Sequence, residues 1–199
     1  MNHLGHLFLS GNNRPLLYGN FIADGVKGRD YENYPPEIKL GILVHREIDS
    51  YTDTYAAFQN FKNNLYPISG KLTGVVIDLF IDHLLAKNWE SYHHLSLEEY
   101  SKWSHQVIDS FAPHPEKVNL FLPHMKEHNW LLYYKKVEGF KWATISLGKR
   151  FKYPINLEDA VNFCIIEQST FYPTFIRFVN DIQRHVQKFI INYHANSGQ

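Results

Sequence analysis

The segment VVIDLFIDHLLA, residues 75–86, places two aspartates in a stretch that is otherwise almost entirely apolar. Asp78 and Asp82 are four residues apart, so an α-helix would present both on one face. The other residues are apolar nearly all the way round, which predicts a largely buried helix. Buried ionised carboxylates need a cation or a dense hydrogen-bond network, because without partners they would take up protons instead. A chain with this segment therefore has to build a polar site inside a helical core.

A second segment, HREIDSYTD at residues 45–53, also combines acids with a histidine at helical spacing. His45 and Asp49 are four residues apart and would share a helix face. Two such faces, opposed, can hold a divalent cation, since mixed carboxylate and imidazole donors are common for Mg, Mn, Fe and Zn. Alternatively, Arg46 and other nearby donors satisfy the acids as a structural polar network. Asp53 falls near the expected helix end, where solvation is the simpler interpretation.

Apolar residues recur at helical spacing along almost the whole of the 199-residue chain, and there is little strand signal. No stretch resembles an interdomain linker, and the length suits one sizeable core. We therefore predict an all-α, single-domain, multi-helix bundle over residues 1–199. Ser96 and Glu99 form a capping-box pattern, and Pro173 should kink or divide the last helix. After a short amino-terminal helix, the expected helices cover residues 14–27, 36–54, 55–65, 73–92, 97–111, 119–134, 137–148 and 157–194.

Lysine plus arginine equals aspartate plus glutamate at 20 each, so the net charge does not indicate a nucleic-acid or membrane partner. The local balance differs between Leu131 and Lys152, where a single acid, Glu138, stands against six basic residues. An acidic partner could dock on such a surface, although a basic helix face is as often only solvated. The six basic residues are Lys135, Lys136, Lys141, Lys149, Arg150 and Lys152.

The amino-terminal segment MNHLGHLFLS lacks the basic flank and cleavage pattern of a signal peptide, and no apolar run approaches the length that spans a bilayer. Cys164 is the single cysteine, so it cannot form an internal disulfide. It lies in an apolar run, and we expect it to be buried. These observations favour a cytoplasmic protein.

Four segments carry a resemblance to a known family: residues 19–28, 35–53, 75–89 and 125–134. They read GNFIADGVKG, PPEIKLGILVHREIDSYTD, VVIDLFIDHLLAKNW and MKEHNWLLYY, and in this order and at these separations they resemble the acyl carrier protein phosphodiesterases. The resemblance covers most of the chain. It implies an all-helical fold distantly related to the HD phosphohydrolases and a divalent metal, typically manganese or magnesium. It further implies removal of 4'-phosphopantetheine from the serine of holo acyl carrier protein, leaving the apo form.

The adjacent His-Asp pair that names the HD superfamily does not occur in this sequence, which reads Asp82-His83 instead. Each candidate residue is therefore judged by its own position. Asp49 is either a ligand or the acceptor that fixes a histidine tautomer, and Asp24 is a ligand or the group that orients the attacking water. Arg46 suits bidentate contact with phosphate. The expected catalytic residues are Asp24, His45, Arg46 and Asp49, and the expected metal ligands are Asp24, His45, Asp78, Asp82 and His83.

Other polar and aromatic residues have two interpretations each. His3 and His6 either line the site from the amino-terminal turn or serve as structural imidazoles. Asn20 lies four residues before Asp24 and would share its helix face. The indoles of Trp130 and Trp142 bracket the basic stretch, and we expect them to pack in the core rather than stack on a ligand.

Acyl carrier proteins are strongly acidic, so the resemblance gives the basic segment 131–152 a role in steering holo acyl carrier protein toward the metal. Lys149 and Arg150 are the expected docking residues. Two alternatives stay open. One is an HD-like metal-dependent hydrolase that acts on a nucleotide or another small phosphoester. The other is a non-enzymatic helical binding module whose acids only satisfy Arg46 and helix termini.

Overall fold

The computed structural model describes residues 1–149 and 157–197. Within these ranges the chain forms α-helices joined by short 3-10 turns, and no strand occurs. The prediction of an all-α bundle is therefore confirmed, while the HD-like kinship stays a prediction. The helices are α1 (His3–Leu9), α2 (Arg14–Ile22), α3 (Pro36–Thr54), α4 (Gln59–Ser69), α5 (Thr73–Lys87), α6 (Leu97–Asp109), α7 (Glu116–Glu127), α8 (Trp130–Tyr133), α9 (Val137–Gly148), α10 (Leu157–Ile166) and α11 (Gln168–Ser197).

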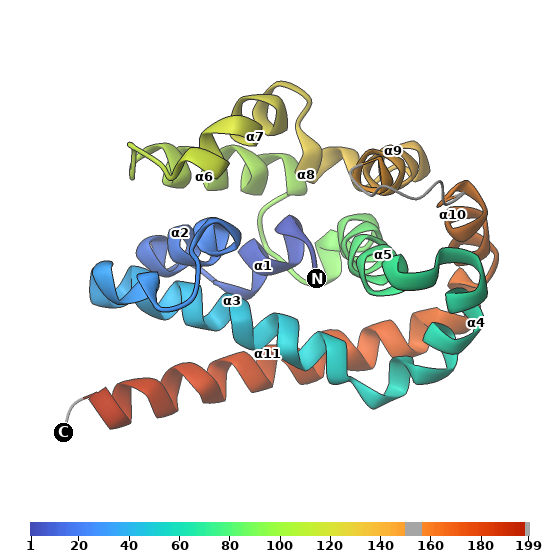
Figure 1. The fold of residues 1–199 in the computed structure, drawn as a ribbon, viewed down its shortest axis with the longest axis horizontal. Helices are drawn as coiled ribbons and strands as arrows, with labels where there is room; N and C mark the ends of the chain where they lie inside the picture. Colours follow the sequence, from blue (N-terminus) through green and yellow to red (C-terminus); the bar gives the residue numbers. More distant parts are fainter. Residues whose placement is uncertain (150–156, 198–199) are drawn as a thin grey trace.

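The helices lie in three tiers in Figure 1. Helices α6, α7, α8 and α9 form the upper tier, and α3 with the long α11 forms the lower one. Between them lie α1, α2 and α5, with α1 packed against both α2 and α5. The amino-terminal helix is therefore at the centre of the molecule, surrounded by elements from the rest of the chain.

Local sequence signals set several helix ends. Helix α3 begins at Pro36, because proline already has a helical φ angle and its missing N–H needs no partner in the first turn. Helix α6 begins after Ser96, and both hydrogen bonds of the predicted capping box with Glu99 are present. The predicted helix over residues 14–27 ends early, at Ile22. A 3-10 turn, Ala23–Gly25, follows, so Asp24 lies on a turn rather than on a helix.

Two long predicted helices are each divided. Asn129 adopts a left-handed conformation, with φ of 42°, and its side chain accepts the amide hydrogen of Leu132. It therefore ends one helix and caps the next, so the predicted helix 119–134 becomes α7 and α8. The predicted helix 157–194 divides at Glu167, ahead of Pro173, and the proline lies inside α11.

Helices α2 and α3 pack backbone to backbone through two glycines. A Cβ atom on Gly19 would lie 2.1 Å from the carbonyl oxygen of Ile38, and one on Gly41 would lie 2.2 Å from that of Leu16. Any larger residue would force the two helices apart. This contact brings Asn20 of α2 against His45 of α3.

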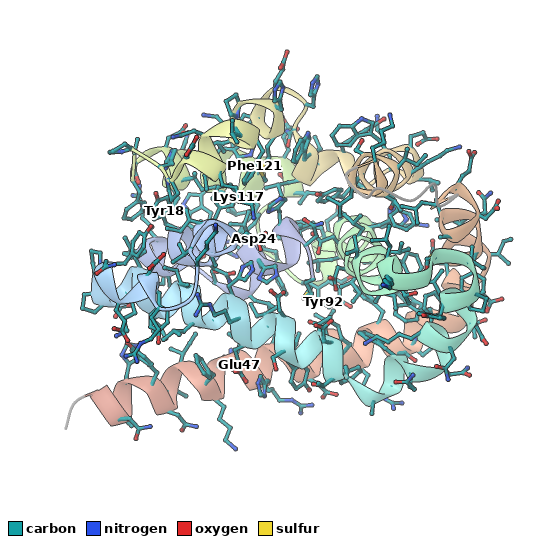
Figure 2. The ribbon with its side chains drawn as sticks, viewed as in Figure 1. Tyr18, Asp24, Glu47, Tyr92, Lys117 and Phe121 are labelled. Carbon is teal, nitrogen blue, oxygen red and sulfur yellow. The ribbon has the colours of Figure 1, made fainter. Side chains whose placement is uncertain are left out.

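The lower tier is fixed by polar contacts between α3 and α11. Glu47, labelled in Figure 2, accepts a hydrogen bond at 2.6 Å from Nε2 of His185, and the Tyr55 hydroxyl donates to Asp181 at 2.7 Å. Cys164 is fully buried, as predicted. Among the described helices, none combines the length and apolar character needed to cross a membrane.

Candidate metal centre

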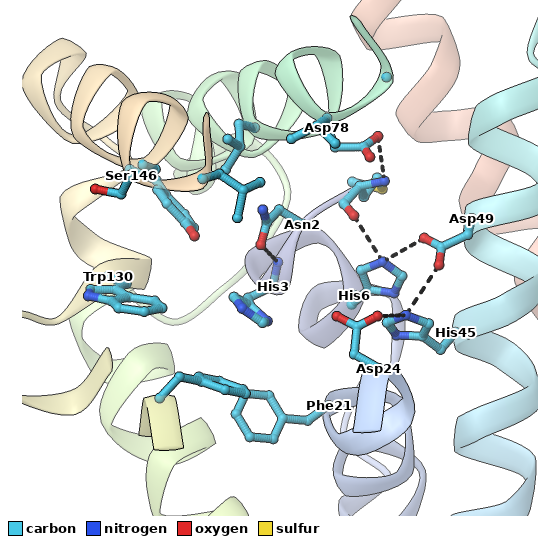
Figure 3. Close-up of a pocket in the computed structure, with 18 of the residues that line it drawn as sticks. Asn2, His3, His6, Phe21, Asp24, His45, Asp49, Asp78, Trp130 and Ser146 are labelled. Atoms are coloured by element: carbon cyan, nitrogen blue, oxygen red, sulfur yellow. Dashed lines mark hydrogen bonds and ion pairs between the residues drawn. The ribbon is translucent and has the colours of Figure 1, made fainter. Parts of the chain in front are cut away.

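A cavity of about 500 Å³ opens between the amino-terminal helices and the upper tier, as the close-up in Figure 3 shows. Its lining is divided by chemistry. The polar lining includes Met1, Asn2, His6, Asn20, Asp24, His45, Asp49, Asp53, Lys71, Asp78, Lys117 and Ser146, and the apolar and aromatic lining includes His3, Phe21, Val75, Leu79, Phe121, Trp130, Tyr134, Trp142 and Leu147.

Two imidazoles and two carboxylates converge at one side of the cavity. Asp49 lies with Oδ1 3.1 Å from Nε2 of His6 and Oδ2 3.2 Å from Nε2 of His45. Oδ1 of Asp24 lies 3.6 Å from the same nitrogen of His45. The donor atoms of His6, His45 and Asp49 all lie within 4.8 Å of one another. We call His6, Asp24, His45 and Asp49 the His/Asp cluster.

Asn20 orients both imidazoles of the cluster. Its side-chain amide donates to the carbonyl of His6 at 2.8 Å and to Oγ of Ser10 at 2.9 Å, so its Oδ1 faces the rings. Nδ1 of His6 donates to this oxygen at 2.9 Å. Nδ1 of His45 donates to the main-chain carbonyl of Asn20 at 2.8 Å. Because both Nδ1 atoms carry the proton, both Nε2 atoms are left to face the carboxylates.

The cluster strongly perturbs the titration of its members. Burial lowers the pKa of His45, but its hydrogen bonds to Asp24 and Asp49 outweigh burial and raise it to about 9. The hydrogen bond to His45 lowers the pKa of Asp24. Burial raises the pKa of Asp49, yet the bonds to His45 and His6 dominate and leave it well below its usual range. His6 has a pKa lowered to about 4 by burial and by His45.

The predicted ligand Asp78 lines the same cavity but lies outside the cluster. Its Oδ1 accepts from the amino group of Met1 at 2.9 Å. The pKa of this amino group is lowered by burial and raised more strongly by Asp78 and neighbouring acids, for a net increase. Asp78 therefore contributes negative charge to the cavity while being paired with a cationic group.

The structure does not bring Asp82 and His83 to the cluster. The buried carboxylate of Asp82 accepts the main-chain amides of Asn2 at 3.1 Å, Leu4 at 2.8 Å and Gly5 at 3.2 Å, so it caps the first turn of α1. Burial raises the pKa of Asp82 to about 7. His83 is also buried and hydrogen-bonds through Nδ1 to the carbonyl of Tyr134. Both residues lie apart from the cavity lining, where they join α5 to its neighbours.

Arg46 and the docking candidates also lie outside the cluster. The guanidinium of Arg46 donates to the carbonyl of Val26 at 3.2 Å and lies 4.9 Å from the ring centroid of Tyr31. It holds the loop that follows Asp24 rather than facing the cavity. Lys149 is exposed at the end of α9, and Arg150 lies outside the described residues.

The expected catalytic residues and metal ligands include neither His6, which belongs to the His/Asp cluster, nor Asn20, which orients its imidazoles. His6 had a structural interpretation that was equally good, since His3 and His6 lie on a short segment of unclear burial. The sequence predicts that Asn20 shares a helix face with Asp24. In the structure its side-chain oxygen accepts hydrogen bonds from the imidazoles of His6 and His45. The sequence does contain a signal for Asn20. It is a polar residue in the largely apolar segment 16–25, with Gly19 and Gly25 nearby.

The chain matches the model of a protein family described as acyl carrier protein phosphodiesterase, over residues 1–182. The chain belongs to this family. An acyl carrier protein phosphodiesterase of Yersinia pestis is 29% identical over 188 residues, which cover 89% of this chain and 96% of that protein. One from Klebsiella pneumoniae (strain 342) is 32% identical over 153 residues, covering 75% and 79% respectively. No solved structure matches the chain.

Proposed function

We propose that this chain is a metal-dependent phosphodiesterase that removes 4'-phosphopantetheine from the serine of acyl carrier protein, with the metal held by the His/Asp cluster. Membership of the family and the names of its relatives support the substrate. The observation that carries the metal is the convergence of electron-rich atoms. With Nδ1–H donated to Asn20, His45 points Nε2 toward the carboxylates of Asp24 and Asp49, so loss of the Nε2 proton to a cation leaves three donor groups aimed at one point.

The environment of His6 supports the same conclusion. Its Nε2 lies 3.0 Å from the carbonyl oxygen of Met1 and 3.1 Å from Oδ1 of Asp49, while Nδ1 already donates to Asn20. Burial lowers the pKa of His6 to about 4, so the ring is neutral near pH 7 and its Nε2 lone pair faces two oxygens. The Nε2 lone pair and these oxygens repel one another, and a cation bound between them would remove this repulsion.

The separations within the cluster fit a shared ion. Donor atoms bound to one metal at about 2.1 Å lie roughly 3 Å apart when they are adjacent. The nitrogen-to-oxygen separations in the cluster are 3.1, 3.2 and 3.6 Å. Two imidazoles beside two carboxylates favour manganese over magnesium, because magnesium prefers oxygen donors and retains water.

The charge of the cavity leaves room for a cation. Four carboxylates line it, from Asp24, Asp49, Asp53 and Asp78, and the cationic groups on the described lining are Lys71, Lys117, the Met1 amino group and, while its Nε2 is protonated, His45. A divalent ion that displaces the His45 proton would add one positive charge to this balance. The added charge would favour binding of a phosphodiester, which is negatively charged.

Three residues of the cavity have roles that follow from their positions. The Asp24 side chain is 61% exposed and lies at the rim of the cluster, where its carboxylate can accept a hydrogen bond from the attacking water and orient it. Lys117 donates to the main-chain carbonyl of Asp24 at 2.7 Å, which holds the turn that carries this acid. Lys71 lines the cavity and offers an ammonium to the phosphoryl oxygens. A divalent ion held by the His/Asp cluster would make water a stronger nucleophile at neutral pH and would offset the negative charge of the phosphoryl group.

The same proposal assigns docking of the acidic carrier to the end of α9. Helix α9 lines the cavity through Trp142, Ser146 and Leu147, and exposed Lys149 follows directly. Basic residues beside the cavity would attract an acidic partner and orient it. Lys141 is less available, because it forms an ion pair with Glu158.

The direct test is to incubate the purified chain with holo acyl carrier protein and follow the carrier by mass spectrometry. Loss of the prosthetic group is expected with manganese, is abolished by a chelator, and returns when manganese is restored. A nucleotide and a simple aryl phosphodiester in parallel reactions separate the carrier-specific proposal from a general phosphohydrolase. Preferential cleavage of either small molecule would contradict the proposed substrate.

A matched pair of substitutions tests the metal centre. Asp49→Asn removes a cluster carboxylate, whereas Asp53→Asn alters the next acid one turn along α3, which also lines the cavity. Manganese binding and turnover should fall together in the first variant and persist in the second. Full activity of Asp49→Asn, or purified protein with neither bound metal nor a metal-induced rise in melting temperature, would contradict the proposal.

Metal stoichiometry needs one further control. His124, Glu127 and His128 form a separate, exposed group of donor atoms at the end of α7. Surface histidines four residues apart on a helix can bind divalent metals adventitiously. Binding should therefore be measured in a His124→Ala, His128→Ala background, in which the His/Asp cluster is untouched.

A further inference from the structure

We propose that the aromatic half of the cavity binds the extended organic arm attached to the substrate phosphate, with His3 as its polar contact. The inference rests on the proposed function, and it specifies where the pantetheine portion lies relative to the His/Asp cluster. Phosphate would occupy the polar half, and the arm would follow the wall formed by Phe21, Phe121, Trp130 and Trp142.

The wall and His3 together form a continuous aromatic surface built from five helices. The ring of His3 on α1 stacks on Phe121 of α7, with centroids 5.3 Å apart, and lies 5.9 Å from Phe21 of α2. Phe121 in turn stacks with Trp130 of α8 at 6.3 Å. Trp142 of α9 continues the surface, 5.4 Å from Trp130. Figure 3 shows His3, Phe21 and Trp130 facing the cavity across from Asp49.

Of the four rings in this wall, Phe21 is buried in the core, whereas Phe121 and Trp130 are only partly buried and Trp142 is exposed. We expected Trp130 and Trp142 to pack in the core, but both line the cavity, and Trp142 is 39% exposed. An aromatic surface left open beside a charged centre favours a ligand that is apolar on one side and anionic at its end.

His3 gives the wall one polar point. Its ring nitrogens have no hydrogen-bond partner among residues 1–149 and 157–197, although the main-chain amide of His3 is bound by the side chain of Asn2. Burial lowers the pKa of His3 to about 4, so the ring is neutral near pH 7. A neutral imidazole can donate to an amide carbonyl or accept from an amide N–H. It therefore suits a chain that contains amides.

The dimensions and chemistry agree with a pantetheine arm. A cavity of about 500 Å³ is within the range of small-molecule sites and exceeds what a phosphate group alone fills. The arm begins with a branched apolar carbon next to the phosphate and continues through two amides. Its branched carbon would contact Phe21 and Phe121, and its amides would come within reach of His3 and the indoles.

Tryptophan fluorescence provides a test that does not depend on turnover. Titration with pantetheine, which lacks phosphate, should change the emission in a saturable manner, and 4'-phosphopantetheine should do so at lower concentration. Inorganic phosphate should give no such change. Trp130→Phe and Trp142→Phe should each remove part of the signal, whereas Trp103→Phe on α6, away from the cavity lining, should retain the response. A signal that follows Trp103, or no saturable response to pantetheine, would overturn the inference.

Two adjacent residues of α7 provide matched variants. Phe121→Ala removes part of the wall, while Leu120→Ala alters a side chain that is 71% exposed and not part of the lining. We expect Phe121→Ala to weaken pantetheine binding about tenfold and to raise KM for the holo carrier protein more than it lowers kcat. The Leu120→Ala variant should match the unaltered chain.

The outcomes separate this inference from the proposed function. Saturable pantetheine binding in a protein that does not cleave the carrier would support the arm site while contradicting the phosphodiesterase. Cleavage of the carrier with equal KM in Phe121→Ala and Leu120→Ala would support the phosphodiesterase while overturning the arm site. If Phe121→Ala does not fold, the fluorescence of the Trp130→Phe and Trp142→Phe variants decides the question.

Discussion

Nδ1 of His45 lies 2.8 Å from the main-chain carbonyl of Asn20 and 3.1 Å from its side-chain oxygen. This contact crosses from α3 to α2 and fixes which nitrogen of the imidazole carries the proton. The same side-chain oxygen accepts from His6. One buried amide therefore sets the tautomer of both imidazoles in the His/Asp cluster, which a metal centre with two histidines requires.

Replacing Asn20 should consequently weaken the proposed metal centre. We expect Asn20→Ala to lower manganese affinity about 10- to 100-fold, because His6 loses the acceptor of its Nδ1–H and His45 keeps only the main-chain carbonyl of residue 20. The substitution also leaves the buried hydrogen-bond partners of the Asn20 side chain unsatisfied, which should lower the free energy of unfolding by about 1–3 kcal/mol. Manganese titration and chemical denaturation measure the two effects. Ser10→Ala, which removes one partner of the Asn20 amide, should reduce stability with little change in affinity.

The stability of the metal-free chain and its metal affinity should depend on pH in opposite directions. The folded-state pKa of His45 is raised from 6.5 to about 9. Its stabilising contribution is therefore complete below pH 6.5 and is lost as the pH rises through 9. Over the same window, manganese should bind more tightly, because the proton on Nε2 competes with the ion. Denaturation with a chelator and manganese titration at several pH values test this.

The variant His45→Asn isolates that pH dependence. It retains a polar side chain on α3 but has no titrating group between pH 6.5 and 9. Its stability curve should be flatter than that of the unaltered chain over this range. Parallel curves for the two proteins would show that other groups, such as the Met1 amino group, determine how stability changes between pH 6.5 and 9.

The close contact of α2 and α3 should be intolerant of a single methyl group. Gly41→Ala would place Cβ 2.2 Å from the carbonyl oxygen of Leu16. We expect a loss of about 3 kcal/mol in the free energy of unfolding, with weaker manganese binding as Asn20 moves away from His45. Gly74→Ala on α5 is the control, since its nearest neighbour, Asp53, is 4.0 Å away. That change should be neutral or stabilise by about 0.5–1 kcal/mol.

Asp82 should prove to be a structural residue. Asp82→Ala would leave three buried main-chain amides without their acceptor, and we expect a loss of about 3 kcal/mol or more in stability. Under conditions where the variant is folded, it should still bind manganese at the same stoichiometry. Loss of metal from a fully folded Asp82→Ala protein would return this residue to the list of ligands.

Docking should respond to charge at the end of α9. Lys149→Glu should raise KM for the holo carrier protein and leave kcat nearly unchanged, and added salt should mimic the effect on the unaltered chain. Lys188→Glu on α11 is the control, since α11 lies in the opposite tier. Steady-state kinetics at two ionic strengths provide the measurement. Equal KM values for both variants would place docking elsewhere.

Local patterns predicted the elements better than their junctions. Pro36 and the capping box at Ser96 were visible because their effect depends on a few adjacent residues. The division at Asn129 was not, because an asparagine takes up a left-handed conformation only when the tertiary structure needs it. Periodicity continues across such a break, so the sequence alone indicates one helix where the structure has two.

The same distinction applies to the candidate site. His45 and Asp49 share a helix face, so their proximity follows from spacing alone. Asp82 was recognised as a buried acid in need of partners, but its partners are amides about eighty residues away. Periodicity cannot reveal such a partner. Likewise, His6 joins the cluster only because α1 is held at the centre of the fold.

The capping of α1 by Asp82 has a consequence for synthesis of the protein on the ribosome. His6, Asp24, His45 and Asp49 all emerge early, but the turn that carries His6 is not fixed until α5 has left the exit tunnel and packed against it. We expect nascent chains that end before residue 82 to lack a finished centre. Binding of the proposed metal ion would then come late in synthesis and be limited to chains whose middle tier has already assembled.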